Sequence, residues 1–216
     1  MGTDAGPAPG TDPAECAPRV RDLDELRRAA ARCTGCELHG PATQTVVGEG
    51  PQSAWLVLVG EQPGDREDIE GAPFVGPAGR LLDRALREAG IARDEVYVTN
   101  AVKHFRFERS GNRRLHKTPA VSHIRACRPW LDAELALVRP TAVGALGATA
   151  GKALLGPSFR ITASRGQVLD FEGRAMVATA HPSAVLRTPP ERRDEAFGAL
   201  VADLGVMAGL RPPEAC

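Results

Sequence analysis

The chain has 216 residues and carries 27 basic and 27 acidic side chains, so its formal net charge at pH 7 is zero. This length fits one domain with a substantial core, and only a local basic patch could indicate a nucleic-acid partner. No apolar run reaches membrane-spanning length, and residues 1–20, rich in Gly, Pro and Ala, lack the layout of a secretory signal. We expect a cytoplasmic monomer with a disordered tail at residues 1–20, one domain at residues 21–210 and a second tail at residues 211–216.

The first half of the chain predicts two helices, a buried strand and a polar loop. Helical spacing of Leu23, Leu26 and Ala30 predicts a helix over residues 23–32. The apolar run at residues 55–59 is short and does not alternate with polar residues, which is typical of a buried parallel strand. It opens into a Gly-Pro loop at residues 60–65 that carries Glu, Gln and Asp. A second helix is predicted over residues 78–89, after Pro77.

The second half continues the alternation of strands and helices. Strands are predicted at residues 96–99, 141–146, 167–171 and 174–179, helices at residues 120–138, 148–155 and 191–207, and a long basic loop at residues 101–118. This order predicts an α/β fold of three layers, α/β/α, around a central, mostly parallel four-stranded sheet. Because the carboxyl ends of parallel strands share one edge, loops 60–65, 100–118 and 181–188 are expected to converge on one crevice.

The cysteines indicate a metal centre or free thiols, because an odd number in a cytoplasmic chain argues against a disulfide framework. The five are Cys16, Cys33, Cys36, Cys127 and Cys216. Cys33 and Cys36 form a chelating pair at a helix end, with Cys127 and His104 as candidate third and fourth ligands. Such a set could hold zinc or an iron–sulfur cluster, unless Cys127 is a buried apolar residue and His104 an ordinary loop residue. Cys16 and Cys216 lie in the tails and are expected to be free.

Basic and aromatic side chains gather in the loop at residues 101–118. Six basic residues from Lys103 to Lys117 accompany the single acid Glu108, and Phe105 and Phe107 lie among them. Such charges neutralise phosphates and such rings stack on bases. The alternative is a charged loop in solvent.

Three further residues are candidates for binding a base. Asn100 ends a strand, and its amide offers both a donor and an acceptor, which suits the Watson–Crick edge of a pyrimidine. Phe74 could present its ring as a stacking platform or fill the core. His181, at another strand end, could be functional or structural.

Together these residues lie in four segments that resemble the motifs of the uracil-DNA glycosylase superfamily. The segments are Gly60-Glu61-Gln62-Pro63-Gly64-Asp65, Pro73-Phe74-Val75-Gly76-Pro77-Ala78-Gly79, Val98-Thr99-Asn100 and His181-Pro182-Ser183. The similarity spans residues 33–197 and is greatest to the iron–sulfur-containing family 4 and 5 group, within it to the UdgX type. Two departures from ordinary family 4 members match that type: Lys103-His104-Phe105 replaces a Lys-Cys-Arg context, and Arg113-Arg114-Leu115-His116 is an insert.

The resemblance implies a DNA-repair enzyme that flips uracil out of DNA, excises it and becomes covalently attached through His116 to C1′ of the abasic deoxyribose. It also implies a 4Fe–4S cluster held by Cys33, Cys36 and Cys127, with His104 as the fourth ligand. The implied substrate-binding residues are Gly60, Gln62, Phe74, Asn100 and Arg114, and the implied catalytic residues are Glu61, Asp65, His116 and His181.

Each implied catalytic residue has a chemical reason. His181 would donate a hydrogen bond to the uracil oxygen, and Glu61 would stabilise the sugar cation or take a proton from His116. Asp65 is a second candidate for handling water or charge. Repulsion from Arg113, Arg114 and Lys117 would keep the His116 imidazole neutral and nucleophilic.

Three other functions stay open from the sequence. An ordinary glycosylase with multiple turnovers would place water where His116 is expected. A damaged-DNA binding module would use the same surface without chemistry, and an iron–sulfur electron carrier would need only the cluster. The expected partners are uracil-containing DNA, single- or double-stranded, and free uracil, with no membrane.

Overall fold

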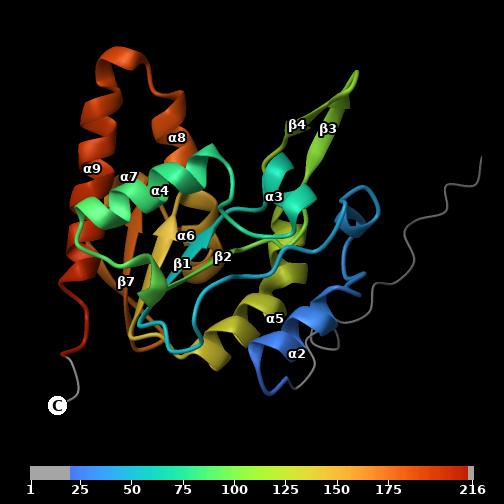
Figure 1. Cartoon of the computed structure of the whole chain (residues 1–216), viewed down its shortest axis with the longest axis horizontal. Helices are drawn as coiled ribbons and strands as arrows, with labels where there is room; N and C mark the ends of the chain where they lie inside the picture. Colours follow the sequence, from blue (N-terminus) through green and yellow to red (C-terminus); the bar gives the residue numbers. More distant parts are fainter. Residues whose placement is uncertain (1–19, 214–216) are drawn as a thin grey trace, which may run out of the picture.

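In the computed structural model, which describes residues 20–213, five strands form the central sheet. Their spatial order is β2 (Val96–Asn100), β1 (Leu56–Gly60), β5 (Ala142–Leu146), β7 (Arg174–Thr179) and β6 (Val168–Phe171) (Figure 1). The first four are parallel, whereas β6 pairs with β7 in antiparallel fashion. The mostly parallel sheet is confirmed, but the expected count of four strands is wrong. The hairpin formed by β6 and β7 adds a fifth, antiparallel strand at one edge.

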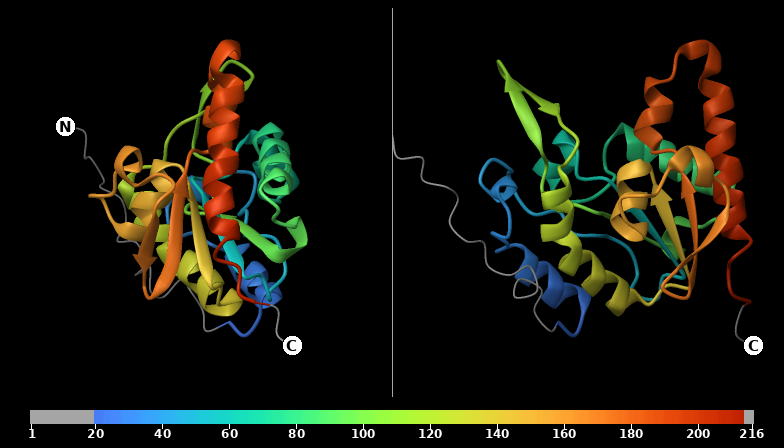
Figure 2. Two further views of the ribbon diagram at one scale, coloured as in Figure 1. Left: turned by 90° about the vertical axis from the view of Figure 1, so that its left-hand side faces the viewer. Right: turned by 180° about the vertical axis from the view of Figure 1, so that it is seen from behind.

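Helices cover both faces of this sheet, as the alternating direction of side chains along a strand requires. Leu56 and Leu58 of β1 pack with α4 (Pro77–Glu88), α8 (Pro182–Arg187) and α9 (Pro190–Ala208). Val57 and Val59 pack on the opposite face with α5 (Val121–Val138) and α6 (Ala148–Leu155), and α2 (Leu23–Ala30) lies outside α5. The two helical layers are seen on either side of the sheet in Figure 2. The predicted three-layer α/β/α class is therefore confirmed.

The remaining elements are short. They are the helical turns η1 (Glu37–His39) and η2 (Arg93–Glu95) and the helices α3 (Asp65–Glu70) and α7 (Ile161–Ser164). Of the helices between residues 20 and 213, none combines the length and apolar composition that crossing a bilayer requires. The predicted tails fall largely on residues 1–19 and 214–216, which lie outside the described residues.

The predicted basic loop at residues 101–118 contains a two-stranded hairpin, so its description as a loop is wrong. Strands β3 (Phe107–Ser110) and β4 (Arg113–His116) pair in antiparallel fashion and project from the body of the molecule (Figures 1 and 2). Ser110 pairs with Arg113, which leaves a two-residue turn in which Gly111 has a φ of 59°. Positive φ at that position is what such a tight turn requires.

A buried ion pair joins β2 to α5. Lys103 and Glu134 have fully buried side chains, and Lys103 Nζ lies 2.6 Å from Glu134 Oε2. Lys103 Nζ also donates to Thr99 Oγ1 at 2.7 Å and to the Asn100 carbonyl at 2.8 Å. Glu134 accepts further hydrogen bonds from the Gly48 amide, at 2.7 Å, and from the Thr99 hydroxyl, at 2.8 Å. Lys103, which the sequence placed among the solvent-facing cations of the loop, is thus part of the core.

Breaking this pair is expected to destabilise the protein strongly. Glu134→Gln should lower the free energy of unfolding by about 3–5 kcal/mol, because it leaves the Lys103 ammonium buried without a counter-charge. Adding Lys103→Met should recover part of the loss, since no lone charge remains. Urea denaturation of the single and double variants measures both effects. Glu88→Gln, in the exposed pair with Arg84, is the control and should change stability by less than about 1 kcal/mol. Strictly additive losses at Lys103 and Glu134 would contradict this account.

Candidate active site

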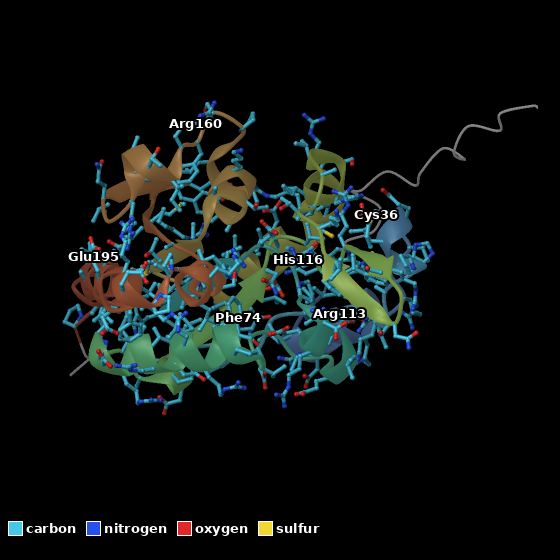
Figure 3. The ribbon with its side chains drawn as sticks, turned by 90° about the horizontal axis from the view of Figure 1, so that it is seen from above. Cys36, Phe74, Arg113, His116, Arg160 and Glu195 are labelled. Carbon is cyan, nitrogen blue, oxygen red and sulfur yellow. The ribbon has the colours of Figure 1, made fainter. Side chains whose placement is uncertain are left out.

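A cavity of about 820 Å³ opens at the carboxyl edge of the parallel strands. The predicted loops converge there, because the cavity is lined by Glu61, Phe74, Asn100, His116 and His181 among others. Figure 3 shows Phe74 and His116 near the centre of this face. The three loops converge on one crevice because they follow parallel strands, whose carboxyl ends share one edge of the sheet.

Gly60 allows two binding side chains to approach the end of β1. A Cβ atom at Gly60 would lie 2.3 Å from Asn100 Oδ1 and 2.8 Å from Phe74 Cζ, so only glycine fits beneath them. Phe74 itself has a φ of 57°, an unusual conformation for a bulky residue. Its carbonyl oxygen would lie 1.5 Å from a Cβ at Gly79, so that glycine is required by close packing. Phe74 thus presents its ring to the cavity from a strained turn, and the ring stacks 6.0 Å from that of His181.

Glu67 fixes the two loops that carry these groups, and the sequence analysis missed it. Its carboxylate accepts hydrogen bonds from the Gly64 amide at 3.1 Å and from the Gly76 amide at 3.0 Å. One bond holds the loop after β1 and the other holds the turn that contains Phe74. The position of Glu67, three residues after the helix N-cap Gly64, was a detectable signal, since it is where a capping glutamate acts.

His181 is held neutral with a defined tautomer. Its Nδ1 accepts from the Ser183 backbone amide at 3.2 Å and lies 2.8 Å from Ser183 Oγ. Because an amide can only donate, the proton of the neutral ring is on Nε2. Burial, followed by the positive charges of Arg187 and His116, lowers the pKa of His181 to about 4. At neutral pH this side chain is therefore a neutral donor at the cavity wall.

His116 lies against Glu61, as expected from the resemblance. Its Nε2 is 3.4 Å from Glu61 Oε1, and the hydroxyl of Thr149 donates to the other carboxylate oxygen, Oε2. Partial burial is the largest cause that lowers the pKa of His116 below 6.5; the charge of Arg187 lowers it further, while Glu61 opposes the shift. The imidazole therefore has a free lone pair at neutral pH.

The cause predicted for this neutral form is wrong, because Arg113, Arg114 and Lys117 are not among the groups that shift the pKa of His116. Lys117 Nζ lies 2.8 Å from Glu108, and Arg114 makes two ion pairs with carboxylates. Arg187, on α8, is the cation that acts on both histidines. Nothing in the spacing of residues indicated this, because Arg187 reaches His116 only through the tertiary fold.

Arg114 and Asp65 lie beside the cavity and do not line it. Arg114 Nε is 2.5 Å from Asp65 Oδ1, and Nη1 is 2.5 Å from the buried Asp68. Its side chain is 14% exposed and covers the Phe107 ring at 5.1 Å. The ion pairs of Arg114 anchor β4 to α3 and so determine where His116 is held, whereas substrate binding by Arg114 and catalysis by Asp65 stay predictions.

Gln62 has a similar anchoring role. Its Nε2 donates to the carbonyls of Arg106 and Lys117, both at 3.1 Å, and its Oε1 accepts from the Arg106 amide at 3.2 Å. The side chain thus joins the base of the hairpin to the loop after β1. Both N–H groups of its amide are therefore engaged.

The four candidate cluster ligands lie outside the cavity, and Figure 3 shows Cys36 beyond His116 as seen from Phe74. A hydrogen bond from the Cys127 thiol and, to a smaller extent, the nearby His104 ring lower the pKa of the Cys36 thiol to about 4. His104 Nε2 is 2.8 Å from Thr45 Oγ1, while its buried Nδ1 has no partner among the described residues. Cys33 Sγ accepts from the indole of Trp130 at 3.3 Å.

The chemistry of these donors is suited to an iron–sulfur cluster. Within residues 20–213, no three His, Cys, Asp or Glu side chains are close enough to surround one metal ion. The ligands of an iron–sulfur cluster bind different irons and can lie further apart. Soft thiols beside a buried imidazole nitrogen that lacks a partner suit such a group.

Comparison with known proteins agrees with this geometry. The model of the uracil DNA glycosylase superfamily matches residues 47–205. A type-4 uracil-DNA glycosylase of Thermotoga maritima is 43% identical over 167 residues, which cover 76% of this chain and 83% of the relative. The type-4 enzyme of Archaeoglobus fulgidus is 33% identical over 202 residues, or 90% of this chain and 97% of the relative. A type-5 uracil-DNA glycosylase of Pyrobaculum aerophilum is 36% identical over 154 residues, or 62% and 63%. The family model and the extent of these matches show that the chain belongs to the uracil-DNA glycosylase superfamily.

Proposed function

We propose that the protein excises uracil from DNA and then becomes covalently linked through His116 to C1′ of the abasic deoxyribose. The names of the type-4 relatives support base excision. The observation that carries the covalent step is the position of His116, whose Nε2 lies 3.4 Å from Glu61 at the same cavity as Asn100 and His181. Uracil-containing DNA is thus the substrate, and free uracil is the product.

Base recognition uses the groups above Gly60. A base inside a duplex must be flipped out, at a cost of a few kcal/mol, before it can enter such a cavity. The ring of Phe74 then stacks on it, and the Asn100 amide, 3% exposed at the end of β2, pairs with its edge. The Nε2–H of His181 donates to the uracil oxygen on which negative charge develops.

The bond changes balance without an outside oxidant or reductant. The electron pair of the glycosidic bond leaves with uracil N1, so uracil departs as an anion and the sugar becomes an oxocarbenium ion. The lone pair of the neutral His116 imidazole forms a new bond to C1′, and the positive charge moves onto the imidazole ring. Glu61, on the same side, stabilises that charge and can accept the ring proton.

Hydrolysis with multiple turnovers is the second candidate. His116 is 48% exposed, so water has a route to the sugar cation if the imidazole does not trap it first. In that case Glu61 would orient water, and the enzyme would release both products.

We also propose that Cys33, Cys36, Cys127 and His104 hold the 4Fe–4S cluster. These ligands come from the segment after α2, the segment after β2 and helix α5. When bound, the cluster would supply a covalent link between these three segments, at a distance from the base pocket.

The covalent function predicts a denaturation-resistant complex. Incubation with a uracil-containing oligonucleotide should give a shifted band on a denaturing gel, and mass spectrometry should find deoxyribose on the peptide containing His116. His116→Ser should form no shifted band but should still release uracil, because water can then reach the sugar cation. Arg114→Ala should slow adduct formation, since the hairpin loses its contacts with Asp65 and Asp68. A shifted band formed by His116→Ser would disprove the assignment, and cleavable abasic product without any band in the wild type would favour hydrolysis.

Base selection should depend on the Asn100 amide. Asn100→Asp replaces an amide donor with an acceptor and leaves an unpaired group facing the base, so single-turnover excision of uracil should fall by about 10- to 100-fold. Discrimination against cytosine should weaken as well. Excision rates on uracil- and cytosine-containing strands measure both effects, and unchanged values would argue against this role.

The cluster predicts iron and sulfide in protein purified without oxygen, together with a brown colour. Cys33→Ala should lower the iron content and the melting temperature, because ligand binding is coupled to folding. Cys216→Ala is the matched control and should change neither. Zinc without iron in the anaerobic preparation would exclude the cluster.

A further inference from the structure

We propose that Thr149, in the first turn of α6, is a positioning residue that directs the carboxylate of Glu61 toward His116. This inference rests on the proposed function for the roles of Glu61 and His116. Neither the family resemblance nor the relatives assign Thr149 any role.

The contact is specific to one carboxylate oxygen. The Thr149 hydroxyl donates to Glu61 Oε2, and the other oxygen, Oε1, faces His116 Nε2 at 3.4 Å. The two oxygens of Glu61 therefore have separate partners on two different segments. With Oε2 engaged by Thr149, the oxygen directed at the imidazole and at the site of the developing cation is Oε1.

The fold explains how Thr149 reaches Glu61. Strands β1 and β5 are parallel neighbours in which Val59 pairs with Ala145, so the residues that follow them lie side by side. Gly147 turns the chain into α6 with a φ of 93° and lies against His181, where a Cβ would be 3.2 Å from that side chain. Thr149 follows two residues later, within the cavity wall.

The hydroxyl is not occupied in stabilising its own helix. Helix α6 has no side-chain hydrogen bond at its N-cap, and among the described residues the Thr149 hydroxyl bonds to Glu61 alone. The Thr149 hydroxyl is therefore not drawn away from Glu61 by a neighbouring backbone carbonyl. A charge-assisted hydrogen bond also restricts the orientations of the carboxylate, so less entropy is lost when the carboxylate acts in the reaction.

Isosteric variants separate the hydroxyl from the shape of the side chain. Thr149→Val should slow single-turnover adduct formation by about 10- to 100-fold, since it removes one hydrogen bond to a charged group. Thr149→Ser keeps the hydroxyl and should form the adduct at close to the wild-type rate. Affinity for DNA carrying a non-cleavable uracil analogue should stay within about twofold for both variants, because the hydroxyl is bonded to Glu61 and both replacements nearly keep the size of the side chain. Thr141→Val, at the other end of β5, is the control: it loses a hydroxyl bonded to the Trp55 carbonyl and should leave the rate unchanged.

A second measurement does not depend on the adduct. The charged groups that act on His116 are Glu61, which raises its pKa, and Arg187, which lowers it, with His181 as the neighbouring titratable ring. If Thr149→Val lets the Glu61 carboxylate turn away, the pKa of His116 should fall further, whereas Thr149→Ser should leave it at the wild-type value. NMR titration of the free protein measures this pKa.

The outcomes distinguish the two proposals. If Thr149→Val matches the wild type in both adduct rate and His116 titration, or if Thr149→Ser is as slow as Thr149→Val, the positioning role is wrong. If the wild type forms no adduct, the covalent function fails, and the NMR comparison alone then decides the role of Thr149. A lowered His116 pKa in Thr149→Val supports positioning in either case.

Discussion

The buried pair of Lys103 and Glu134 connects the two parts of this protein on which its chemistry depends. Lys103 Nζ bonds to the carbonyl of Asn100, and the Lys103 backbone amide donates to Cys127 Sγ at 3.4 Å. Glu134 lies on α5, two turns after Cys127. One lysine thus contacts the end of β2, which we propose reads the base, and helix α5, which carries the proposed cluster ligand Cys127. Because both side chains are buried, separating them would leave two unpaired charges out of contact with water, which is costly. The contact therefore holds β2 and α5 together.

Basic residues in and around the hairpin form ion pairs within the protein, although their number alone would suggest that they bind DNA. Arg114 is engaged by Asp65 and Asp68, Lys117 by Glu108, and Lys103 by Glu134. Two further arginines of the hairpin, Arg109 and Arg113, are exposed. The ion pairs of Arg114 therefore position the hairpin. They hold β4 against α3, and His116 is the last residue of β4.

Two histidines share one cavity and one electrostatic environment but have different partners. Burial and the charge of Arg187 favour the neutral form of both rings. Their hydrogen bonds then separate them. Ser183 occupies Nδ1 of His181 and leaves the proton on Nε2, whereas His116 faces the carboxylate of Glu61. A neutral imidazole can donate from one nitrogen and attack with the other, so the partner determines which property is used.

The sequence by itself determined the layer order, because apolar runs such as residues 55–59 must be buried on both faces. It also located the loops of the site, because strands that alternate with helices align their carboxyl ends. It did not determine the partners of those loops. The β3–β4 hairpin was not predicted, because its many charged residues give no alternation of apolar and polar side chains. Gly111 was the one sign of its turn. Each of three contacts joins separate segments of the chain. Thr149 bonds to Glu61, Glu67 bonds to the turn that contains Phe74, and the charge of Arg187 acts on His116. Local spacing carries periodicity and turn chemistry, whereas hydrogen bonds and ion pairs between distant segments depend on distances that only the folded chain sets.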